Sequence, residues 1–88
     1  MADVTYADAL ARLRAECGKP TGEDTAGGLR LAWWKAAGRT ARLSDESGHE
    51  LWLTLQELDG STAFRVLAGD APLTPLADAV RDAGAWLR

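Results

Sequence analysis

Residues 51–68 read LWLTLQELDGSTAFRVLA, and this stretch decides the fold. Apolar residues alternate from Leu51 to Leu55, which is typical of a strand with one buried face. Asp59-Gly60 is a strong signal for a two-residue turn in which both residues have a positive φ. The stretch therefore predicts a β-hairpin over about residues 51–68.

The length of this turn fixes which residues share a face. A two-residue loop pairs Leu58 with Ser61. The side expected to be buried then carries Leu51, Leu53, Leu55, Phe64, Val66 and Ala68. The opposite side carries Trp52, Thr54, Arg65 and Leu67. A slip of one residue would mix the two sets, so the sequence predicts this register.

A second hairpin is predicted over about residues 29–44. Leu29, Leu31 and Trp33 alternate, and Gly38 suits the third position of a three-residue loop over 36–38. That loop places Trp33 on the buried side, whereas Trp34 joins the exposed side. Residues 29–36 also fit a helical spacing, so a helix is the alternative. The glycines at 27–28 and the adjacent tryptophans favour a strand.

Helices are predicted at both ends of the chain. Over residues 5–17 apolar residues recur at helical spacing, with Thr5 as the N-cap and Gly18 after the end. The second helix covers about residues 75–87, with Thr74 as its N-cap and Pro75 in its first position. Residues 18–28 hold four glycines and one proline, which predicts a mobile loop.

These elements predict one domain over residues 1–88, of the α+β class. The order is a helix, a four-stranded antiparallel meander and a helix. Each helix has one apolar stripe and the sheet has one apolar face. Both helices are therefore expected on one face of the sheet, as a two-layer sandwich.

The other face of this sheet is the candidate binding surface. It is expected to carry two tryptophans and three arginines, namely Arg30, Trp34, Arg42, Trp52 and Arg65. Tryptophan and arginine are enriched at the energetic centres of interfaces. Four interpretations remain open: a second small core beneath a helix or loop, a homodimer, another protein partner, and a nucleic acid.

Composition narrows the class of protein further. The chain has 88 residues, a net charge of −3, one cysteine and one histidine. His49 lies in a polar turn, and Cys17 lies on an apolar helix stripe, where it is expected to be a small buried apolar residue. The sequence suggests no catalytic residue, metal site or cofactor. It has no apolar segment long enough to span a membrane and no secretory signal, so a cytoplasmic location is expected.

The sequence therefore predicts a small non-catalytic binding module. We expect it to bind a protein, or a second copy of itself, through the Trp/Arg face, as an adaptor or a small inhibitor does. The alternative is a nucleic-acid-binding module that uses the same face, with tryptophans stacked on bases and arginines on phosphates.

Overall fold

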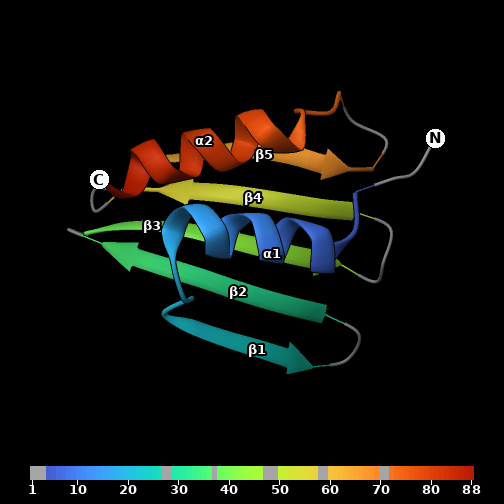
Figure 1. Cartoon of the computed structure of the whole chain (residues 1–88), viewed down its shortest axis with the longest axis horizontal. Helices are drawn as coiled ribbons and strands as arrows, with labels where there is room; N and C mark the ends of the chain where they lie inside the picture. Colours follow the sequence, from blue (N-terminus) through green and yellow to red (C-terminus); the bar gives the residue numbers. More distant parts are fainter. Residues whose placement is uncertain (1–3, 27–28, 37, 47–49, 58–59, 70–71) are drawn as a thin grey trace.

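The protein folds into two helices and a five-stranded antiparallel sheet (Figure 1). This computed structural model describes residues 4–26, 29–36, 38–46, 50–57, 60–69 and 72–88. In chain order the elements are α1 (Tyr6–Cys17), β1 (Gly22–Ala26), β2 (Leu29–Ala36), β3 (Arg39–Glu46), β4 (Glu50–Gln56), β5 (Thr62–Ala68) and α2 (Leu76–Leu87). The strands follow one another in the sheet as they do in the chain, so the predicted meander between two helices is confirmed.

The sheet has five strands rather than the predicted four, because β1 forms within residues 18–28. The prediction of a loop is wrong for residues 22–26, which pair along β2. Gly22 does not break this strand. A Cβ atom there would lie 2.2 Å from the ring of Trp33, so the glycine lets the indole lie against the β1 backbone.

The first helix begins and ends as predicted. The Thr5 side chain accepts a hydrogen bond of 3.1 Å from the Asp8 N–H, and Gly18 follows α1 with a φ of 85°. The second helix begins at Leu76, and Thr74 does not cap it. Instead the Thr74 N–H donates to the Val66 carbonyl at 2.8 Å, which ties the connection between β5 and α2 to strand β5.

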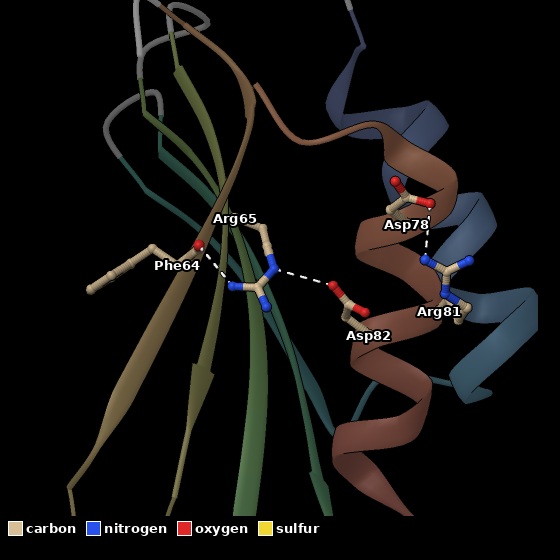
Figure 2. A network of polar contacts seen from close by, with 5 residues as sticks. All are labelled: Phe64, Arg65, Asp78, Arg81 and Asp82. Atoms are coloured by element: carbon tan, nitrogen blue, oxygen red, sulfur yellow. Dashed lines mark hydrogen bonds and ion pairs between the residues drawn. The ribbon is translucent and has the colours of Figure 1, made fainter. Parts of the chain in front are cut away.

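Both helices lie on the same side of the sheet, as Figures 1 and 2 show. We call the side that faces the helices the inner face and the opposite side the outer face. The core lies between the helices and the inner face, where apolar side chains from both layers meet. Its most deeply buried members are Ala9, Leu13, Ala32, Ala41, Leu43, Leu53, Ala79 and Ala83.

Two strand registers differ from the prediction by one residue. Ala36 pairs with Arg39, so two residues rather than three connect β2 to β3. In the other hairpin Thr54 pairs with Phe64, where the sequence predicts Arg65. A one-residue shift exchanges the faces of a strand, so β2 and most of β5 are inverted relative to the prediction. The predicted turn residue Asp59 lies outside the described residues.

The two edge strands differ in length and in what borders them. β1 has five residues, and two of these, Glu23 and Asp24, are acidic and exposed. β5 has seven residues, and its pairing with β4 contains an irregularity at Leu51/Trp52. The bond from Thr74 occupies one of its backbone acceptors.

Candidate functional site

The five predicted binding residues do not share one face. Arg42 and Trp52 lie on the outer face, as predicted. Arg30, Trp34 and Arg65 lie on the inner face, so their predicted placement is wrong. The physical reason is the shift in the two registers, which turns every side chain of β2 and those of β5 up to Val66 to the other side.

Trp34 belongs to the core instead of the surface. Its side chain is only 3% exposed, and its indole N–H donates to the Gly18 carbonyl at 2.8 Å. A buried tryptophan needs such a partner for its polar atom. Because Gly18 directly follows α1, this bond joins the end of the helix to the second strand.

The two inverted arginines are tolerated beside the core because each meets a carboxylate. Arg30 lies 2.6 Å from Asp45, its cross-strand partner on β3, and 4.7 Å above the ring of Tyr6. Arg65 lies 3.2 Å from Asp82 on α2. Figure 2 shows Arg65 pointing toward α2 and its neighbour Phe64 pointing away from both helices. These contacts hold both arginines on the side of the helices, away from the outer face.

The outer face is therefore built from other residues than the sequence predicts. Four cross-strand rows follow from the registers, and the one that lies beyond the first row below includes Leu29 and Glu50. The first row contains Asp24, Leu31, Ser44, Trp52 and Val66. The second row contains Gly22, Trp33, Arg42, Thr54 and Phe64. The third row contains Lys35, Thr40, Gln56 and Thr62.

The first two rows carry an aromatic and apolar surface that none of the described helices and strands covers. Phe64 is 52% exposed, and its ring stands edge-on to that of Trp52, with centroids 5.6 Å apart and planes at 86°. The Trp52 indole donates to Glu50 at 2.7 Å. Thr54 is only 6% exposed although it is on the outer face, because it lies between the larger side chains of its cross-strand partners Arg42 and Phe64.

Sequence reasoning missed Trp33, Phe64 and Val66 because it placed all three in the core. One signal could have found Trp33. Gly38 also fits the second position of a two-residue turn, where a positive φ is common, and its φ is 82°. That turn length gives the observed register of β2.

A shallow depression of about 760 Å³ adjoins this surface at the end of the sheet where β2 turns into β3. Its lining includes Leu31, Trp33, Lys35, Arg39, Thr40, Arg42, Gln56 and Glu57. Arg39 is paired with Glu57 at 3.5 Å. Among the described residues, neither Lys35 nor Arg42 has a carboxylate within ion-pair distance, and both are exposed. The depression is therefore positively charged, and the indole of Trp33 forms part of its lining.

The titratable groups with shifted pKa values lie away from the outer face. Burial raises the pKa of the Cys17 thiol, and the nearby carboxylate of Glu16 adds to this. Burial also raises the pKa of Tyr6, helped by Glu23. His49 lies outside the described residues. Within the described ranges, no three His, Cys, Asp or Glu side chains gather closely enough to hold a metal ion.

Comparisons with protein-family models, with characterised proteins and with solved structures give no match for this chain. No helix in the part of the chain that the structure describes has the length and hydropathy needed to cross a membrane. The functional argument therefore depends on the surface of the protein itself.

Proposed function

We propose that the chain is a non-catalytic module that binds another protein through the outer face of its sheet. The observation that supports this proposal is the uncovered apolar surface around Phe64. Leu29 and Phe64 are exposed, and Trp33, Trp52 and Val66 are only partly buried.

An apolar surface of this kind costs free energy in water. Complete burial of a large apolar side chain contributes about 1.5–3 kcal/mol, so a partner that covers the half-exposed Phe64 gains about half of that from this residue. Contiguous apolar patches are uncommon on the surfaces of monomers and are typical of interaction sites. This surface also combines aromatic side chains with an arginine, and both residue types are enriched at the centres of protein–protein interfaces.

The experiment selects binders from a displayed library of random peptides with the wild-type protein as bait. The test variant is Phe64→Ser, which makes the outer face more polar at a side chain that is already half exposed. The matched control is Leu73→Ser, because Leu73 is 53% exposed but lies outside the sheet. Peptides that bind the wild type and Leu73→Ser but not Phe64→Ser would support the proposal. Equal binding to all three proteins would contradict it.

Light scattering on the same three proteins detects a homodimer. If the wild type is a dimer and Phe64→Ser is a monomer, the protein that covers the outer face is a second copy of this chain.

Single-stranded nucleic acid is a second candidate, supported by the aromatic side chains on an open sheet face with Arg42 among them. Bases stack on such rings, and the cations Arg42 and Lys35 neutralise phosphates. Binding of labelled single-stranded DNA should then weaken steeply as salt increases, because counterions are released on binding. Binding through aromatic contacts to a protein loses much less affinity. A flat salt dependence in a fluorescence anisotropy titration would eliminate this candidate.

A further inference from the structure

We propose that the partner is an acidic and apolar protein segment, and that the depression beside Trp33 binds one of its carboxylates through Arg42 and Lys35. This inference rests on the proposed function and specifies the chemistry of the partner. It follows from how the charged groups of the sheet are paired.

Every described arginine that faces the helices from the sheet already has a carboxylate. Arg30 is paired with Asp45, Arg39 with Glu57 and Arg65 with Asp82. Arg39 and Arg30 are also stacked on aromatic rings of the helices. Arg42 lies on the central strand and faces the other way, with no carboxylate among the described residues. Within the described part of the chain, Arg42 therefore lacks the carboxylate partner that the inner arginines have.

The surroundings of Arg42 suit a carboxylate. Trp33 is its cross-strand partner on β2, and Thr54 is its partner on β4. The Trp33 ring lies over Gly22 on the β1 side, and Arg42 is exposed, so its guanidinium is accessible to a carboxylate. A guanidinium can donate two parallel hydrogen bonds to one carboxylate, and Lys35 in the same depression adds a second positive charge.

The apolar part of the segment would lie over Trp52 and Phe64. From Arg42 on β3 to Phe64 on β5 the distance is two strand spacings, or about 10 Å. An extended peptide covers that distance in about three residues. The segment should therefore carry Asp or Glu about three residues from a large apolar side chain.

A second copy of this chain is a poorer match for Arg42 than such a segment. The described acids on the outer face lie at its margins. Asp24 is on the edge strand β1, and Glu50 already accepts the hydrogen bond from Trp52. A nucleic acid carries a phosphate at every nucleotide, so the net charge of −3 opposes its approach more than that of an apolar segment with one carboxylate. A segment that carries an acidic residue among apolar ones can bind both the positively charged depression and the aromatic surface beside it.

The test uses peptides selected with the wild-type protein as bait. Each selected peptide is resynthesised with its Asp and Glu residues replaced by Asn and Gln, and both forms are titrated by fluorescence anisotropy. We expect the acidic form to bind the wild type at least about fivefold more tightly, as a charge-assisted hydrogen bond implies. The preference should fall to near one in the double variant Arg42→Gln/Lys35→Gln. It should persist in the control Arg12→Gln, which removes an exposed charge on α1.

The outcomes separate this inference from the proposed function. If the acidic and amide peptides bind equally and both lose affinity in Phe64→Ser, the carboxylate inference is wrong and the proposed function stands. If Phe64→Ser has no effect, the proposed function is wrong as well. A dimer that excludes the peptides, or tight binding of single-stranded DNA that requires Arg42, would also overturn the inference. Circular dichroism checks that each variant is folded.

Discussion

The two adjacent tryptophans of β2 provide the strongest test of the fold, because they lie on opposite faces. Trp34→Ala removes a side chain that is 3% exposed and breaks its hydrogen bond to the Gly18 carbonyl. Truncation of a buried aromatic residue costs about 3–5 kcal/mol. A domain of this size has a total stability of about 4–13 kcal/mol, so the variant should lose a large part of it. Trp33→Ala removes a partly exposed side chain and should cost about 1–2 kcal/mol.

The assay is urea denaturation followed by far-UV circular dichroism, with the wild type and both alanine variants. Trp34→Phe is a milder variant that keeps a ring and removes the donor, and it should cost about 1 kcal/mol for the hydrogen bond plus a small packing loss. The alternation read from the sequence alone predicts the reverse order of the two alanine variants. The observed register is therefore refuted if Trp33→Ala destabilises the protein more than Trp34→Ala.

Three further predictions concern other contacts. Gly22→Ala places a Cβ where the Trp33 ring lies, so it should destabilise the protein by about 1–3 kcal/mol and change the tryptophan emission; unchanged urea denaturation would contradict the close approach. A double-mutant cycle with Arg65→Ala and Asp82→Ala should give a coupling of about 0.5–1 kcal/mol, because both side chains are about one-third exposed; a coupling of zero would show that the pair does not hold β5 to α2. Because burial raises the pKa of Cys17, less thiolate is present at neutral pH than in the unfolded chain. Iodoacetamide should therefore alkylate the folded protein more slowly, and equal rates would contradict this.

The sequence was sufficient for features that depend on local spacing. The boundaries of α1 follow from one apolar stripe, with Thr5 before it and Gly18 after it. The inner residues of β3 and β4, such as Leu43 and Leu53, follow from simple alternation. These signals depend on residues that are close together in the chain, so they can be read without knowledge of the tertiary contacts.

The candidate site was harder to predict because it depends on turn length. Periodicity shows that alternate residues share a face, but it does not show which face is buried. The turn decides this, and a difference of one residue exchanges Trp33 with Trp34. The arginines gave a second misleading signal. Arg65 lies on the inner face, where Asp82, from a helix later in the chain, pairs with it. Strand β1 was missed because it lies among several glycines, which are typical of a loop. The sequence does not show that Gly22 instead allows the Trp33 ring to approach the strand backbone.

The unequal edges of the sheet have a consequence for how the protein behaves at high concentration. A sheet grows into a fibre when an incoming strand finds a free row of backbone groups at its border. At β5 an approaching strand meets a strand whose own pairing with β4 is irregular. It also finds the Val66 carbonyl already hydrogen-bonded to the Thr74 N–H. At β1 it meets a strand of only five residues, and the carboxylates of Glu23 and Asp24 repel an incoming strand that is also acidic. Growth by strand addition is thus discouraged at both ends, and the protein can display an apolar face without polymerising through its borders.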